Sequence, residues 1–337
     1  MNEIEAGIFG LAIGDALGVP VEFSSRAQLD AHPVDRMYGH GTYRKPAGTW
    51  SDDTSLTLAL ADSLSQGLID YSDMMGRFIA WFHDGAYTTD GHRFDIGTTT
   101  LTAFQRFLQG AEPTASGGCA ANENGNGSLM RILPIVYYLR ARDGKILTAE
   151  GVEAIHNISA LTHGHPRSQI ACVAFCNVAH QILEGGSLHE AVHQGLSDVV
   201  DYYNNLPEYA KELHRFTCLS VDEQGQLNSL VDIERDDIRS SGYVVDTLDA
   251  ALWCLVNHQG YSTTVLAAVN LGSDTDTTGA VCGALAGLYY QLRDDKTQRI
   301  PEDWFEELGN KPGILGICSA LGATLKAMGS QKESANA

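Results

Sequence analysis

The chain has 337 residues, of which 44% are hydrophobic and 19% are charged, so it can bury a sizeable core in one large domain or two smaller ones. Its 42 acidic residues against 22 basic ones give a formal net charge of −20. A surface with this charge repels phosphate backbones and anionic lipids, which argues against charge-driven binding of nucleic acid or of a membrane surface.

The cysteines and the N-terminus bear on the cellular compartment. Seven cysteines, scattered from Cys119 to Cys318, are an odd number and do not resemble a disulfide framework. The acidic start of the chain, Met-Asn-Glu-Ile-Glu, lacks the positive charge of a signal peptide. We also expect no apolar run near the ~20 residues of a membrane span. The sequence therefore predicts a cytoplasmic protein without a membrane partner.

Apolar residues recur at three- and four-residue spacing along most of the chain, and convincing strand patterns are scarce. No linker or clear repeat divides the sequence. We therefore predict one all-α domain over residues 1–328 and a polar, disordered tail over residues 329–337. The expected helices cover residues 3–17, 55–64, 74–82, 99–108, 129–139, 155–161, 168–183, 244–256, 262–270 and 278–292.

Two of these helices carry glycine at four-residue spacing. Glycine weakens a helix by ~1 kcal/mol relative to alanine, so this pattern predicts close backbone approach between packed helices. Pro134 should kink or interrupt the helix that carries Arg131. The glycines are Gly10, Gly14 and Gly18 in the first helix and Gly279, Gly283 and Gly287 in the last.

Two segments, residues 50–54 (Trp-Ser-Asp-Asp-Thr) and 273–277 (Ser-Asp-Thr-Asp-Thr), place paired carboxylates at the start of a helix. Either segment alone fits an N-cap, but a cap needs only one acceptor, and a second carboxylate adds repulsion. Four aspartates brought together with hydroxyls would form an all-oxygen ligand set for two hard divalent cations. An EF-hand is excluded because Leu285 stands where the bidentate glutamate should be. We expect the two segments to meet in space.

Four further segments carry unusual polar residues. Glu22 stands alone in an apolar stretch, and Asp95 lies between two bulky apolar residues at a helix start. Residues 125–131 form a glycine-rich loop whose free N–H groups could hold a phosphate or diol oxygen. Residues 161–166 place His163 and His165 at a helix boundary. Structural interpretations stay open: a helix cap for Asp95, a turn residue for Glu22 and a buried histidine for His163.

With these residues in view, the chain resembles the ADP-ribosylglycohydrolase family, the group that contains the dinitrogenase-reductase-activating glycohydrolases. The likeness runs from Ile4 to about Tyr290 and rests on four segments in order: the two acidic ones, residues 125–131, and residues 241–248 (Ser-Gly-Tyr-Val-Val-Asp-Thr-Leu). It implies a single-domain, orthogonal multi-helix fold with a binuclear Mg²⁺ or Mn²⁺ centre in a cleft. The family often has threonine where Ser51 stands, and a hydroxyl is kept.

The resemblance also implies roles for individual residues. Asp95 would face a guanidinium, because its segment, 94–97 (Phe-Asp-Ile-Gly), is typical of relatives that act on ADP-ribosyl-arginine. Relatives that favour other linkages tend to rely on the acid matching Glu22, for which we expect a role as a base or a gate. The implied metal ligands are Ser51, Asp52, Asp53, Asp274, Asp276 and Thr277; the implied substrate contacts are Asn126, Gly127, Ser128, His163 and Tyr243.

These assignments predict a hydrolase, dependent on two divalent cations, that removes ADP-ribose from an arginine side chain of a modified protein and releases ADP-ribose. A carboxylate pair, Asp95 with Glu22, is the expected acid–base equipment for a glycosidic bond. Two alternatives share the fold: a hydrolase of other conjugates, such as O-acetyl-ADP-ribose or ADP-ribosyl-serine, and a non-catalytic ADP-ribose-binding protein. Asp15, Arg131 and His165 are interpreted as structural residues.

Overall fold

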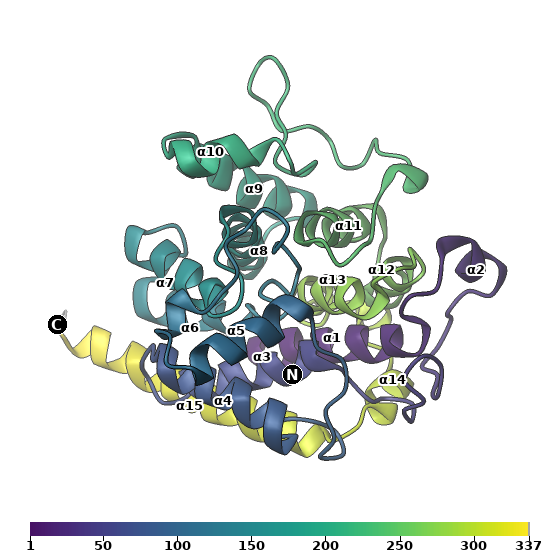
Figure 1. The fold of residues 1–337 in the computed structure, drawn as a ribbon. Coiled ribbons are helices and arrows are strands. Elements are labelled where there is room, and N and C mark those ends of the chain that lie inside the picture. The colour runs from purple at the N-terminus through teal and green to yellow at the C-terminus, as the bar shows by residue number, and fades with distance from the viewer. Residues whose placement is uncertain (336–337) are drawn as a thin grey trace.

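Helices form all the regular structure in residues 1–335, the part of the chain described by the computed structural model, and no strand occurs there. The all-α prediction is confirmed (Figure 1). The helices are α1 (Glu3–Gly18), α2 (Arg26–Ala31), α3 (Asp52–Leu64), α4 (Tyr71–Asp84), α5 (Thr98–Leu108), α6 (Pro134–Asp143), α7 (Ala149–Ala160), α8 (Pro166–Glu184), α9 (Leu188–Asn204), α10 (Pro207–Leu213), α11 (Val244–Asn257), α12 (Tyr261–Val269), α13 (Thr275–Tyr290), α14 (Glu302–Glu307) and α15 (Lys311–Ala335).

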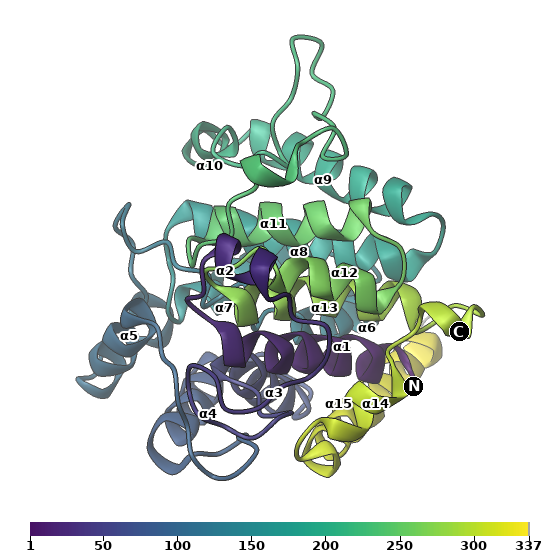
Figure 2. The ribbon, with the colours of Figure 1, turned by 90° about the vertical axis from the view of Figure 1, so that its right-hand side faces the viewer.

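The centre of the molecule is the pair α1 and α13, which join the two ends of the sequence (Figures 1 and 2). They run antiparallel with their backbones almost in contact. A Cβ atom on Gly14 would lie 2.1 Å from the carbonyl oxygen of Gly279, and one on Gly10 would lie 2.4 Å from that of Gly283. The close approach predicted from the glycine spacing is therefore confirmed.

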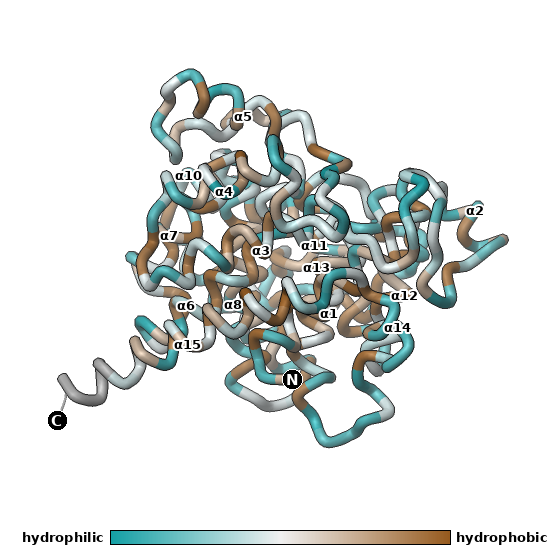
Figure 3. Tube along the Cα trace, turned by 90° about the horizontal axis from the view of Figure 1, so that it is seen from below, coloured by the Kyte–Doolittle hydropathy of each residue, from teal (hydrophilic) through white to brown (hydrophobic). Residues whose placement is uncertain are grey.

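The other helices stack on the two sides of this pair. On one side α3 packs against α1, with α4, α6 and α15 around it. On the other side α8, α11 and α12 contact α13, and α9 and α10 form the outer layer beyond them, as Figure 2 shows. Hydrophobic segments gather in the central helices in Figure 3, whereas the loops at the edge have long hydrophilic stretches.

Some predicted boundaries need correction. The helix expected over residues 129–139 begins only at Pro134, so Arg131 lies in the preceding turn. Proline suits the first helical position because the N–H group that it lacks would have no partner there. The prediction also omitted α9, although Ser187 and Glu190 form a capping box at its start and its apolar residues are helically spaced.

The C-terminal residues differ from the predicted disordered tail. Helix α15 continues to Ala335, so residues 329–335 are helical, and residues 336–337 lie outside the described part of the chain. No proline follows Gly329, and Gln331, Lys332 and Glu333 are favourable helix residues, so nothing in the local sequence ends the helix earlier.

Two segments are long and apolar enough, by length and composition, to cross a membrane, contrary to our expectation of none. They are residues Glu3–Val21, of which 83% is buried in the fold, and Lys311–Ser330, of which 17% is buried. The first contains α1, the central helix of the core. A core helix therefore satisfies this criterion as readily as a membrane span does.

Candidate functional site

The N-terminus of α3 is held by Asp15, which comes from α1. The Asp15 carboxylate accepts hydrogen bonds from the backbone N–H groups of Ser51 and Thr54, at 2.9 and 3.0 Å, and from the Thr54 hydroxyl at 2.6 Å. Burial raises the pKa of Asp15 to about 6 despite these bonds. Asp15 is therefore a structural residue, as interpreted from the sequence. Its particular role is to fix the helix start that carries Asp52 and Asp53.

The N-terminus of α13 is fixed by α1 and by the glycine-rich loop. The Thr275 hydroxyl donates to the carbonyl of Gly18 at 2.8 Å, and a Cβ on Gly18 would lie 2.3 Å from the Asp276 Cα. From the other side, the Asn126 amide donates to Asp274 Oδ2 at 2.9 Å. Asp276 is therefore held directly against the α1 backbone, so its position depends on the core.

The two acidic helix starts meet, as we expected. The Thr277 hydroxyl donates to Asp53 Oδ2 at 3.4 Å, and the Ser51 hydroxyl donates to the same oxygen at 3.1 Å. Asp52, Asp53 and Asp276 are all buried, and burial together with neighbouring carboxylates raises the pKa of each well above its ordinary value. Such a group of buried acids needs either protons or cations.

The same oxygens fit a cation site. Carboxylate oxygens of Glu22, Asp274 and Asp276 lie within 4.8 Å of one another. Among the described residues, Asp53 Oδ1, Asp276 Oδ2 and Glu22 Oε2 are buried without a hydrogen-bond partner. Buried acceptors are normally satisfied, so three orphaned carboxylate oxygens in one place indicate ligand capacity. Glu22 thus belongs to the acidic cluster geometrically, whereas the sequence predicted an acid–base role for it and did not include it among the metal ligands.

A cleft of about 320 Å³ opens onto these acids. Glu22, Asp52, Asp95, Asp274 and Thr277 line it, together with the start of α5 and the glycine-rich loop. Burial raises the pKa of Asp95, and the charge of Asp274 adds to the shift; burial likewise raises the pKa of Glu22 to about 8, with Asp95 as the next cause. The cleft therefore brings Asp95 and Glu22 close enough to influence one another.

Tyr43 was not anticipated from the sequence. Its phenol group is close enough to Glu22 and Asp95 to lower the pKa of each acid, which partly opposes the effect of burial. The Tyr43 ring lies 4.8 Å from that of Phe94. A tyrosine in a loop between helices gives no sequence signal for this position, because only the tertiary fold brings it to the acids.

The glycine-rich loop and His163 form the opposite wall of the cleft. A Cβ on Gly127 would lie 3.0 Å from the His163 ring, so the ring packs directly on the loop. The Thr162 hydroxyl accepts from an Arg131 N–H at 2.8 Å and lies 2.8 Å from His163 Nδ1. Among the described residues the Thr162 hydroxyl has no other acceptor within hydrogen-bond distance, so we assign its proton to Nδ1 and the ring proton of His163 to Nε2.

This arrangement defines what His163 can offer a ligand. Burial, with the nearby Arg131 charge, lowers the pKa of His163 to about 3, so the ring is neutral at neutral pH. A neutral imidazole with its proton on Nε2 is a hydrogen-bond donor on that side. Arg131 also donates to the carbonyl of Gly127, which ties the loop to the same network. Arg131 is therefore structural, as interpreted, and it positions the donor wall.

The structure places two predicted substrate contacts away from this cleft. Ser128 is fully buried, and its hydroxyl accepts from the Ser159 hydroxyl at 2.9 Å, so it faces the core. Tyr243 lines a neighbouring cavity of about 280 Å³ with Arg215 and Arg239, and its hydroxyl accepts from Arg167 at 3.3 Å. Asn126, Gly127 and His163 do line the cleft.

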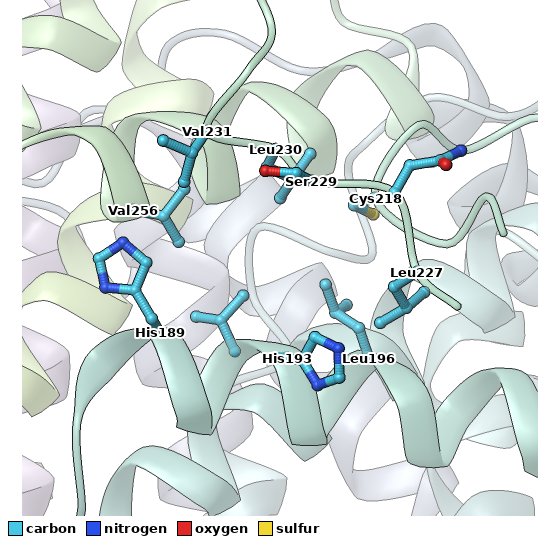
Figure 4. Close-up of a pocket in the computed structure, with 11 residues that line it drawn as sticks. His189, His193, Leu196, Cys218, Leu227, Ser229, Leu230, Val231 and Val256 are labelled. Atoms are coloured by element: carbon cyan, nitrogen blue, oxygen red, sulfur yellow. The ribbon is translucent and has the colours of Figure 1, made fainter. Parts of the chain in front are cut away.

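A second cavity, of about 230 Å³, lies between α9, residues 227–231 and the end of α11 (Figure 4). Its walls are mainly apolar, with His189 and His193 from α9 at one side. Burial raises the pKa of the Cys218 thiol well above its ordinary value, so that thiol is unreactive. The chemistry-bearing residues lie in the acidic cleft and not here.

Comparison with known proteins agrees with this geometry. A family model described as ADP-ribosylglycohydrolase matches residues 1–332. The chain is 32% identical to the ADP-ribosylarginine hydrolase Tri1 of Pseudomonas putida over 95% of this chain and 78% of the relative. It is 28% identical to the ADP-ribosyl-[dinitrogen reductase] glycohydrolase of Rhodospirillum rubrum over 90% of this chain and 88% of the relative.

A solved structure is also similar. A chain of an ADP-ribosylglycohydrolase-related protein complex superposes with a TM-score of 0.73 at 28% identity, over 96% of this chain and 98% of that one. The family model and both relatives cover nearly the whole sequence, including the two acidic helix starts and the glycine-rich loop. The chain therefore belongs to the ADP-ribosylglycohydrolase family.

Proposed function

We propose that this protein hydrolyses the N-glycosidic bond between ADP-ribose and an arginine side chain of a modified protein, with the help of divalent cations. The observation that carries the proposal is the cleft itself: it joins a buried, cation-competent acid cluster, a separate carboxylate at Asp95 and a wall of hydrogen-bond donors. The names of two relatives, both called ADP-ribosylarginine hydrolase Tri1, support the choice of arginine.

In this proposal Asp95 and Glu22 have different roles in the reaction. Asp95 lies at the cleft wall, where its carboxyl group can contact the guanidinium and, in its protonated form, deliver a proton to the leaving nitrogen. A water molecule adds to C1″ of the ribose as the C1″–N bond breaks, and its proton passes to a second carboxylate, for which Glu22 is the candidate. The products are free arginine side chain and ADP-ribose, so the atoms and protons balance.

The donor wall suits the other end of the substrate. The glycine-rich loop and the His163 Nε2–H can donate hydrogen bonds to anionic or hydroxyl oxygens, as a diphosphate or a ribose diol would supply. Because the protein carries a net charge of −20, binding a diphosphate needs local donors or cations rather than the overall field. This wall supplies the donors.

Divalent cations would be held by Ser51, Asp52, Asp53, Asp274, Asp276 and Thr277, with Glu22 close by. When bound they would orient and polarise the ribose hydroxyls and lower the pKa of the surrounding acids. Mg²⁺ and Mn²⁺ both suit an all-oxygen set. We also propose a cytoplasmic location, which is supported by seven cysteines that are all free thiols in the described chain.

The test is a comparison of linkages. Purified protein is given substrates carrying ADP-ribose on arginine, serine or a carboxylate, with and without a chelator, and release of ADP-ribose is measured. We expect chelator-sensitive release from the arginine substrate. Release from the serine substrate alone would contradict the proposed function and indicate an ADP-ribosyl hydrolase with a different linkage preference. Binding of ADP-ribose without release from any substrate would indicate a non-catalytic protein.

A further inference from the structure

Phe23 stands at the mouth of the acidic cleft with its side chain 69% exposed. It directly follows Glu22, and its φ of +66° lies in the left-handed region. Two backbone hydrogen bonds to the start of α13 hold it there: the Phe23 N–H donates to the Ser273 carbonyl at 2.7 Å, and the Ser273 N–H donates to the Ser24 carbonyl at 2.8 Å. These two hydrogen bonds therefore hold the Phe23 backbone in the left-handed conformation.

A phenylalanine is an unfavourable residue for this conformation. The left-handed region costs a residue with a side chain ~1–2 kcal/mol, whereas glycine adopts it freely. The fold gains nothing in return: within residues 1–335, Phe23 lies outside the hydrophobic core cluster and its partly buried periphery, and no ring pairs with it. A strained, exposed aromatic side chain at a site is grounds for a functional hypothesis.

The chemistry around the ring specifies its partner. Phe23 shares the cleft with Glu22, Asp95 and Asp274, so a ligand group at this end is expected to carry positive charge. The face of a phenyl ring attracts cations, and a planar guanidinium can stack on it. The surrounding acids and the ring are thus complementary to the same group.

Phe94 provides an internal comparison. It also flanks a cleft acid, Asp95, but its ring is already engaged: the Lys45 ammonium lies 5.1 Å from the ring centroid, and the Tyr43 ring lies 4.8 Å away. Lys45 is in turn held by Asp90 at 3.1 Å. Cation and ring are thus paired inside the protein at Phe94, whereas Phe23 presents the same kind of surface without an internal partner.

We infer that Phe23 is a specificity residue whose ring stacks on the guanidinium of the ADP-ribosylated arginine while Asp95 binds its N–H groups. This inference rests on the proposed function and adds to it a residue that distinguishes a planar cation from an uncharged serine linkage. Phe23 takes no part in bond breaking, so its removal should change substrate affinity more than turnover.

The experiment compares Phe23→Asn with Phe23→Tyr and with Leu68→Asn. Asparagine tolerates the left-handed conformation, tyrosine keeps the aromatic face, and Leu68 is a 51%-exposed apolar residue that follows the far end of α3. For arginine-linked substrate we expect Phe23→Asn to raise KM about threefold to tenfold with kcat retained. Phe23→Tyr and Leu68→Asn should keep the wild-type KM.

Two further readouts separate recognition from a structural role. The affinity of Phe23→Asn for free ADP-ribose should be unchanged, because that ligand lacks the guanidinium. Its Tm should equal or exceed that of the wild type, because strain is relieved. An unchanged KM, or a KM rise accompanied by a lower Tm and weaker ADP-ribose binding, overturns the inference.

Failure of the proposed function can be recognised separately in the same assay. Wild-type protein that releases ADP-ribose from serine but not from arginine overturns the proposed function and this inference together. Wild-type protein that is active on arginine, with a Phe23→Asn variant that has the same KM, overturns the inference alone.

Discussion

The acidic cleft and the apolar cavity beside α9 are similar in size, about 320 and 230 Å³, but they differ in how their residues are satisfied. At the cleft and in the acid cluster beside it, three buried carboxylate oxygens lack hydrogen-bond partners, and the cleft residues Phe23 and Asp95 have positive φ angles. The walls of the apolar cavity carry neither orphaned carboxylates nor such φ angles among the described residues.

The difference shows why cavity size is a poor guide to function. Unsatisfied acceptors and strained backbone both raise the free energy of the folded protein, and they persist only where the surrounding structure imposes them. A cavity lined by relaxed apolar side chains requires no such explanation. Substitutions in the two regions should therefore differ in their effects.

The largest effect is expected from Asp276→Asn, which removes one of the orphaned oxygens. Hydrolysis should fall by about a thousandfold or more if this carboxylate holds a cation. The rise in Tm that Mg²⁺ or Mn²⁺ gives the wild type should be lost. Without cations, the variant should have a higher Tm than the wild type, because burial and the charges of Glu22 and Asp274 disfavour a carboxylate at this position.

Asp84→Asn is the matched control, since Asp84 is exposed at the end of α4. It should leave both turnover and the cation-induced Tm shift unchanged. Full turnover by Asp276→Asn, together with an intact Tm shift, would contradict a cation role for the cleft.

The next effect concerns the crossing that supports the cleft. Gly14→Ala places a methyl group about where the Gly279 carbonyl lies, so α1 and α13 must separate, and we expect a loss of about 3 kcal/mol in the free energy of unfolding. Gly76→Ala in α4, where a Cβ meets nothing within 4 Å, should instead stabilise the protein by ~1 kcal/mol. Denaturant unfolding measures both values, and equal effects would argue against the close crossing.

A smaller effect is expected from Thr162→Val, which removes the hydroxyl between Arg131 and His163. The His163 ring loses the partner that keeps its proton on Nε2, so the Kd for ADP-ribose should rise about tenfold. Thr162→Ser should restore wild-type binding. Imidazole ¹⁵N shifts report the tautomer directly, and an Nδ1–H signal in the wild type would contradict the assignment.

The smallest effect is expected in the apolar cavity. His193→Leu changes an exposed wall residue, so the free energy of unfolding should move by less than about 0.5 kcal/mol, and KM and kcat should stay at wild-type values. A change in KM for the ADP-ribosylated substrate would mean that this cavity contributes to the reaction and does not differ from the acidic cleft in this respect.

Much of the fold was predictable from local signals. Helical periodicity located ten helices, and the glycine spacing predicted close backbone approach between packed helices, though not that α1 and α13 would be the two partners. The meeting of the two acidic helix starts was predictable from charge. Each segment carries two carboxylates that repel one another, and cations bound between the two segments would relieve the repulsion in both. These inferences depend on residue type and spacing, which the sequence contains.

The rest depended on tertiary position. Asp15 holds α3 from a different helix, and Tyr43 and Phe23 reach the cleft from loops, so no spacing rule identifies them. Ser128 belongs to the glycine-rich loop, yet its side chain points to the core while Gly127 faces the cleft. Neighbouring loop residues can face opposite ways, and only the fold decides which one a ligand can reach.

The contact between Gly18 and Asp276 has a consequence for how the protein loses activity when it unfolds. Because a candidate ligand on α13 is pressed against the backbone of α1, another helix of the buried core, the geometry of the site has no hinge that could loosen while the rest stays folded. Heat or denaturant should therefore abolish hydrolysis and helical structure at the same midpoint, without a folded but inactive state between them.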